Sequence, residues 1–238
     1  MKQGKTGASA ISQYCTLVKK DLTREFHSLD MLGSMILYAA LVLIVYGAAL
    51  SHADKSFDIL SIAAGLLWVL IVFTSLIGLN RSFAYEKENN CLDALLLAPI
   101  DRSLIFLAKA TSNLLFLLIV EIIVIPLFAF FFLQDQTFAQ EAPFALLVFA
   151  FGTIGCTGIG TFLSTITANT RGRDVMLAAL MIPLTFPLLY ACVSATNVCL
   201  TGGYDFSSSF IPALTIICVY DIVMSLLSWV LYDFVVST

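Results

Sequence analysis

Charged residues are scarce in this sequence. Only 12% of its 238 residues are Asp, Glu, Lys or Arg, whereas 60% are hydrophobic. A soluble domain carries about 25% charged residues. The few basic residues form no patch interleaved with aromatic side chains, which argues against nucleic acid as a partner. We therefore predict an integral membrane protein rather than a soluble domain.

Motifs for catalysis and nucleotide binding are also missing. The sequence contains no HExxH and no GxSxG, and its glycine-rich stretch Gly152–Gly160 lacks the Lys-Ser/Thr ending of a phosphate-binding loop. Six cysteines are present, but no two have the CxxC spacing of a zinc site or a redox pair. We predict that the chain is not an enzyme and binds no cofactor or metal of its own. Any ATP that it uses would be hydrolysed by a partner.

What the sequence has in abundance is long apolar runs. Each approaches the ~20 residues that a helix needs to cross the hydrocarbon core of a membrane. Unpaired backbone groups are not tolerated there, so each run is predicted to be a helix. The runs are Met31–Leu50, Ile59–Leu79, Leu104–Leu133, Pro143–Thr167, Val175–Val193 and Pro212–Phe234. The predicted fold is an all-α integral membrane protein with six transmembrane helices in one domain, residues 1–238.

A further helix is predicted before the first run, over residues 11–29. Ile11, Tyr14, Val18, Leu22 and Phe26 recur at helical spacing, and basic residues lie between them. A basic amphipathic helix is typical of a segment that lies in the membrane interface. The alternative is a simple cytosolic extension of the first spanning helix.

The basic residues predict the orientation. Eleven of the twelve Lys and Arg fall in the N-terminal segment and in the two loop regions that lie on the same side of the membrane, counting Lys109 as able to snorkel out of its run. The alternate loops carry only Lys55. By the positive-inside rule both termini are cytoplasmic.

Residues 80–103 form a polar segment on that cytoplasmic side, and they contain a short helix signal. Asn90 is a suitable N-cap, Asp93 follows three residues later, and Pro99 ends the helix. Three leucines share one face at positions i, i+3 and i+4. They are Leu92, Leu95 and Leu96. A short amphipathic helix there indicates a docking surface, and its rival is a solvated loop whose leucines lie on the membrane surface.

Small residues and prolines mark two of the runs. Gly152, Cys156 and Gly160 follow each other at four-residue spacing, which allows helices to approach closely, either at a seam between subunits or within one bundle. Pro183 and Pro187 remove two backbone donors, so we expect a kink, which is either static or part of a moving helix.

Two carboxyl groups lie deep within apolar runs, Glu121 and Asp221. Each is costly in lipid and is therefore expected to face the protein interior or water. They are candidates for a substrate path or a proton relay. The alternative is an interhelical hydrogen bond made by a protonated carboxyl.

Several stretches, in order, resemble the cytochrome c maturation permease family, the haem exporter protein B (CcmB) group of ABC transporter membrane subunits. One is CLDALLLAPIDRSLIFLAK, Cys91–Lys109, with its acidic-leucine stretch and proline. A second is the glycine-rich run, basic-glycine turn and double-proline run of Phe151–Ala191, and a third is Leu214–Asp221. The resemblance covers nearly the whole chain and implies an ABC-2-type permease-like fold.

The resemblance implies a bacterial or organellar inner-membrane subunit, needed for haem export or delivery in c-type cytochrome biogenesis. Its implied partners are a cytoplasmic ATP-binding subunit (CcmA-like) that holds ATP and Mg, a haem-handling membrane protein (CcmC-like), a small accessory subunit (CcmD-like), lipids and a possible second permease copy. Haem is a possible substrate of the complex. The segment 80–103 would then dock on the ATPase, with a polar rim around the three leucines. The rim residues are Glu86, Glu88, Asp93 and Arg102.

Two other functions stay open. An ABC-2-type permease for another substrate, such as a lipid, a drug or a glycan precursor, would share this topology and docking segment. A membrane scaffold without transport activity would also fit the hydrophobic pattern.

Overall fold

The structure is a computed structural model of the chain and describes residues 10–51, 59–88, 102–133, 142–167, 170, 172–201 and 206–237. These residues form helices, as the apolar runs predict, and no strand occurs among them. The helices are α1 (Ala10–Ser28), α2 (Asp30–Ser51), α3 (Leu60–Glu88), α5 (Arg102–Phe132), α6 (Ala142–Thr167), α7 (Arg173–Thr201) and α8 (Phe206–Ser237).

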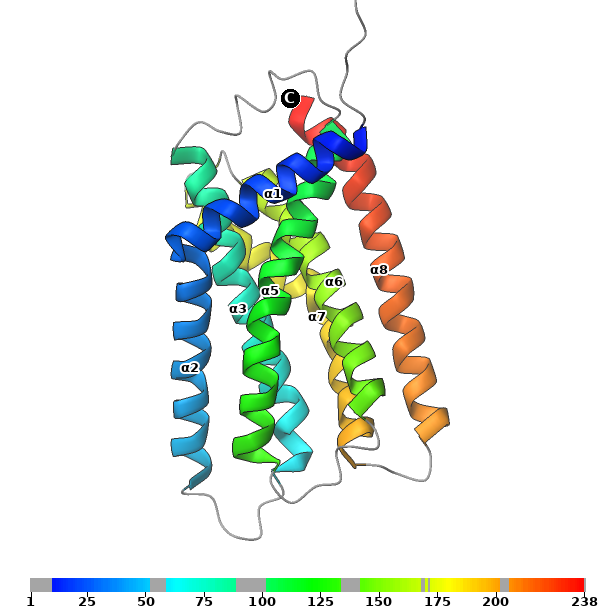
Figure 1. Ribbon diagram of the computed structural model, residues 1–238. Coiled ribbons are helices and arrows are strands. Elements are labelled where there is room, and N and C mark those ends of the chain that lie inside the picture. Colours follow the sequence, from blue (N-terminus) through cyan, green and yellow to red (C-terminus); the bar gives the residue numbers. More distant parts are fainter. Residues whose placement is uncertain are drawn as a thin grey trace, which may run out of the picture.

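Six of the described helices, α2 to α8, are long and apolar enough to span a membrane. They run lengthwise beside one another, whereas α1 lies across one end of the bundle (Figure 1), where it contacts α5 and the start of α2. A helix that lies across the ends of spanning helices has the placement expected of an interfacial segment.

The centre of the bundle is built by α3 and α6. In their apolar windows 67% and 61% of the residues are buried, against 28–33% in the windows of the other four helices. Trp68 of α3 stacks on Phe149 of α6, with ring centroids 5.7 Å apart, and donates from Nε1 to the Thr196 hydroxyl of α7 at 2.9 Å. The outward faces of α2, α5, α7 and α8 carry large apolar side chains, as lipid-facing surfaces do.

Three helices are clearly longer than the hydrophobic pattern predicts. Helix α8 begins at Phe206 rather than at Pro212. Helix α3 continues past Leu79 to Glu88, so the first part of the polar segment 80–103 is helical, and α7 continues past Val193 to Thr201. Polar side chains near the end of a spanning helix can reach water. The helix can therefore continue beyond its apolar part, with its backbone groups still hydrogen-bonded along the helix. Both prolines of α7 lie within this continuous helix.

A single residue separates α1 from α2. Leu29 has φ = 55°, in the left-handed region that L-residues seldom adopt, and it redirects the chain from the end of the bundle into the first spanning helix. The Glu25 carboxylate accepts bonds from the backbone N–H groups of Met31 and Leu32, both at 2.8 Å. These bonds satisfy two of the donors that the first turn of α2 leaves without a helical partner.

Candidate functional site: buried polar contacts between the helices

Helix α1 is fixed to the bundle by a buried ion pair. The Nζ of Lys109 on α5 lies 2.9 Å from Oδ2 of Asp21, and the two side chains are 6% and 3% exposed. Nearby, the Tyr14 hydroxyl donates to the hydroxyl of Thr111 at 2.8 Å. The expectation that Lys109 snorkels to the membrane surface is therefore wrong, because Asp21 supplies the counter-charge inside the protein.

The charges around Asp21 settle its ionisation. Burial opposes the charged form and by itself would raise the pKa of Asp21, but Lys109 and Lys20 together outweigh burial and leave the pKa below its ordinary value. The Lys20 ammonium lies 3.3 Å from the other carboxylate oxygen and is 42% exposed. Asp21 is therefore charged at neutral pH, and most of that charge is neutralised within the fold.

Only part of the apolar face that the sequence predicts for α1 touches the bundle, where Tyr14, Val18 and Leu22 are half-buried. Ile11 and Phe26 are 74% and 54% exposed, whereas Leu17 packs on Ile105 of α5 and the acidic Asp21 and Glu25 are buried. Apolar spacing alone missed both acids. Asp21 and Glu25 follow Leu17 by four and eight residues, and this spacing places the three side chains on one helical face. That spacing is the signal in the sequence that could have identified them.

Glu121 lies in the middle of α5 and is 4% exposed. Its Oε1 is 2.7 Å from the Thr153 hydroxyl of α6, which is also 2.6 Å from the Phe149 carbonyl oxygen. A hydroxyl has one proton. Thr153 can therefore donate to an ionised Glu121, or it can donate to the carbonyl and accept from a protonated Glu121. The contact is interhelical, as the alternative reading of Glu121 expects.

Asp221 on α8 is 7% exposed, and neither of its carboxylate oxygens has a hydrogen-bond partner among the described residues. Its Oδ1 lies against Gly155 of α6, where a Cβ atom would collide with it. Cys156, the next residue, is fully buried. The two carboxyl groups thus approach α6 from different helices.

The small residues of α6 accommodate neighbours from the same bundle. A side chain at Gly152 would meet Trp68 of α3 and the Cys192 sulfur of α7, and one at Gly160 would meet Leu79 of α3. Cys156 is fully buried between them. These contacts lie within one chain, as expected if the glycine stretch packs helices within one bundle rather than at a seam between subunits.

The residues assigned to ATPase docking are placed only in part. Leu92, Asp93, Leu95 and Leu96 lie outside the described residues, as does the short helix predicted around them. Glu86 and Glu88 belong to the last turn of α3, and Arg102 is the first residue of α5. The segment therefore connects two helices that both contribute to the bundle interior.

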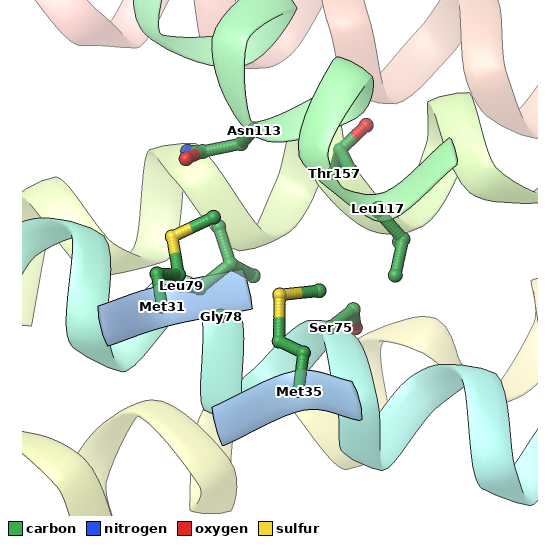
Figure 2. Close-up of a pocket in the computed structure, with 8 residues that line it drawn as sticks. All are labelled: Met31, Met35, Ser75, Gly78, Leu79, Asn113, Leu117 and Thr157. Carbon is green, nitrogen blue, oxygen red and sulfur yellow. The ribbon is translucent and has the colours of Figure 1, made fainter. Parts of the chain in front are cut away.

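A small pocket lies between α2, α3, α5 and α6, in the half of the bundle nearer α1 (Figure 2). Its lining includes Met31, Met35, Ser75, Gly78, Asn113 and Thr157. The Asn113 amide nitrogen donates to the Thr161 hydroxyl of α6 at 3.0 Å, but its buried Oδ1 has no partner among the described residues. Nothing in the hydrophobic pattern predicted this pocket, because its lining comes from four separate helices.

No group of three or more His, Cys, Asp and Glu side chains that could hold a metal ion is found in the described ranges. The buried polar groups instead make contacts from one helix to another within an apolar bundle. Together with the six candidate spans, this arrangement defines the class of the protein as a multi-pass α-helical membrane protein.

Comparison with known proteins places it more narrowly. Residues 12–232 match the family described as CcmB protein, and the chain belongs to that family. It is 26% identical to heme exporter protein B of Pseudomonas aeruginosa over 171 residues, which cover 72% of this chain and 74% of the relative. It is also 29% identical to heme exporter protein B of Rhodobacter capsulatus over 128 residues, covering 54% and 57%, and 24% identical to that of Bradyrhizobium diazoefficiens over 158 residues, covering 66% and 68%.

Proposed function

We propose that this chain is the membrane permease subunit of an ABC transporter complex that serves haem export in c-type cytochrome biogenesis. The observation that carries the proposal is the family match over residues 12–232, together with relatives whose name is heme exporter protein B. The six candidate spans agree with a permease role.

ATP hydrolysis belongs to a partner in this proposal. The sequence has no phosphate-binding loop, so a CcmA-like subunit would supply ATP binding and hydrolysis. The segment between α3 and α5 would dock on it, with Leu92, Leu95 and Leu96 in a groove of the partner and the charged residues Glu86, Glu88, Asp93 and Arg102 at the rim. CcmC-like and CcmD-like subunits complete the proposed complex.

The proposed orientation puts α1, the docking segment and both termini in the cytoplasm, in a bacterial inner membrane or its organellar equivalent. The support is the distribution of Lys and Arg, eleven of which lie on that side. The docking segment joins the ends of α3 and α5 that lie next to α1, so a partner bound there would contact the bundle at the end where α1 is anchored.

Within this function the chain would transmit the energy of ATP hydrolysis rather than ligate haem iron. The two histidines are His27 and His52, and neither lies in a candidate span. Histidine and methionine are common axial ligands of haem iron, and the candidate spans contain no histidine and only five methionines. This scarcity of ligands supports transmission to a haem-handling subunit or to a periplasmic haem chaperone.

The test is complementation. Deletion of the gene is expected to abolish covalently haem-stained c-type cytochromes in the membrane and periplasm, and the wild-type gene to restore them. Normal cytochrome levels in a deletion strain without a second copy would refute the proposal and favour a permease for another substrate.

A charge reversal tests the docking segment separately. Glu88→Lys is expected to leave the protein in the membrane, but to lower both co-purification of the ATPase and cytochrome assembly. Glu141→Lys is the matched control, because that residue lies in a connection predicted to face the other side. Equal results for the two variants would remove the docking role, and would favour a scaffold that needs no coupling to ATP.

A further inference from the structure

Helices α5 and α6 face each other with buried polar side chains at intervals of four residues, with one apolar interruption on α5 at Leu117. Four residues are about one helical turn, so such side chains lie in a row on one face. On α5 the row is Lys109, Asn113 and Glu121, and on α6 it is Thr153, Thr157 and Thr161. Each of the six is at most 5% exposed. We call this pair of rows the polar seam.

The polar seam is bonded across the helices at two levels. Nearer α1, the Asn113 amide donates to Thr161, and in the middle of the bundle Thr153 contacts Glu121. Between these levels α5 carries Leu117 instead of a polar residue. The pocket of Figure 2 opens at that gap, with Asn113 on one side and Thr157 on the other.

The size and the lining of the pocket fit water. It offers about 10 Å³ to water-sized molecules, which is room for roughly one water. The Asn113 Oδ1 is an acceptor without a partner among the described residues, and leaving such a group buried and unpaired is unfavourable. The Ser75 and Thr157 hydroxyls donate to backbone carbonyls and so keep lone pairs that can accept from a water. One water can therefore donate one hydrogen bond to the Asn113 amide oxygen and another to a hydroxyl oxygen at the same time.

We propose that the polar seam binds a water in this pocket, where the water bridges the Asn113 amide oxygen and the Thr157 hydroxyl. The water site does not rest on the proposed haem function, and its failure would leave that function untouched.

The first test is hydroxyl-radical labelling by X-ray radiolysis of water, read out by mass spectrometry of methionine oxidation. Met31 and Met35 line the pocket and are 3% and 1% exposed, whereas Met181 is equally buried at 0% and does not line it. Radicals form where water is bound, so Met31 and Met35 are expected to be oxidised several-fold faster than Met181. Equal rates for all three would overturn the water site.

A pair of alanine variants on α3 tests the same point. A Cβ at Gly78 would meet the Met35 sulfur at 2.7 Å, so Gly78→Ala pushes the flexible end of Met35 into the pocket. Gly65→Ala is the matched control, because nothing lies within 4 Å of a Cβ there. Labelling of Met31 is expected to fall several-fold in Gly78→Ala and to stay unchanged in Gly65→Ala. Unchanged labelling in both variants would contradict the proposal.

Discussion

Removal of one partner of the ion pair between Asp21 and Lys109 should strongly destabilise the fold. Its charges are 2.9 Å apart, and the side chains are 3% and 6% exposed. With an effective dielectric constant of about 20 their attraction is about 6 kcal/mol, much of which offsets the cost of removing both charges from water. Loss of one partner leaves the other buried and unpaired, at a cost of about 3–5 kcal/mol.

We therefore expect Asp21→Asn and Lys109→Met each to lower the free energy of unfolding by about 3–5 kcal/mol. The double variant should lose much less than the sum, because neither charge then lacks a counter-charge. Unfolding in mixed micelles, followed by tryptophan fluorescence, measures all three. Lys20→Met is the control. Lys20 contacts the same carboxylate but is 42% exposed, so its loss should cost about 0–1 kcal/mol. Additive losses in the double variant would refute the pairing.

Acid provides an independent check on the same pair. The pKa of Asp21 lies below its ordinary value of 3.8 in the fold. The stability that its charge contributes is therefore fully present above about pH 4 and is lost as the pH falls through the lowered pKa. Asp21→Asn should remove this part of the acid dependence and leave stability near neutral pH lower but flat. A wild type and a variant that lose stability in parallel below pH 4 would contradict the assignment.

Three further predictions concern single contacts, all measured as unfolding free energies in the same micelles. Gly155→Ala should destabilise the protein by about 1–3 kcal/mol, because the new Cβ meets the Asp221 carboxylate and Leu188. Gly158→Ala should be neutral or slightly stabilising, because a Cβ there meets only the Ser225 hydroxyl oxygen, at 3.9 Å. Equal effects of the two variants would contradict the close packing of α8 on Gly155. Glu25→Ala should lower the free energy of unfolding by about 1–2 kcal/mol, because the N-terminus of α2 loses its cap. Glu25→Gln should lower it less, because the amide oxygen can still accept the two backbone hydrogen bonds. A larger loss in Glu25→Gln than in Glu25→Ala would contradict the capping role. Thr196→Val should cost about 1 kcal/mol through loss of the Trp68 bond and should shift the tryptophan emission, and an unchanged spectrum would argue against that bond.

The six spans were predictable because lipid leaves a chain few options. Apolar residues must continue for about 20 positions and the backbone must bond to itself, and both requirements are local in sequence. The ends of α3 and α7 were less predictable, since Glu88 and Thr201 extend helices beyond their apolar parts. Hydropathy reports where lipid ends, and a helix can continue into water.

The buried polar contacts depended on partners that periodicity does not reveal. Its place in an apolar run predicts that Lys109 reaches the membrane surface, and apolar spacing gives no role to Asp21 among the basic residues of α1, whereas the fold pairs the two side chains. The same limit applies to Asn113, whose bond to Thr161 and whose pocket both depend on the register of α5 against α6. Glu121 and Asp221 were easier to identify, because a carboxyl within an apolar run is unusual whatever its partner.

The anchoring of α1 also has a consequence for the order in which the protein is made. Tyr14 and Thr111 are 97 residues apart, so α1 leaves the ribosome long before α5, which holds its hydrogen-bond and ion-pair partners. Until then Asp21 has no partner in α5, and α1 has only lipid and the start of α2 to rest on. Domains form in the order in which their parts emerge, and contacts distant in sequence close late. The docking of α1 on α5 is thus a late step of assembly, and truncated chains that end before α5 should leave α1 open to protease.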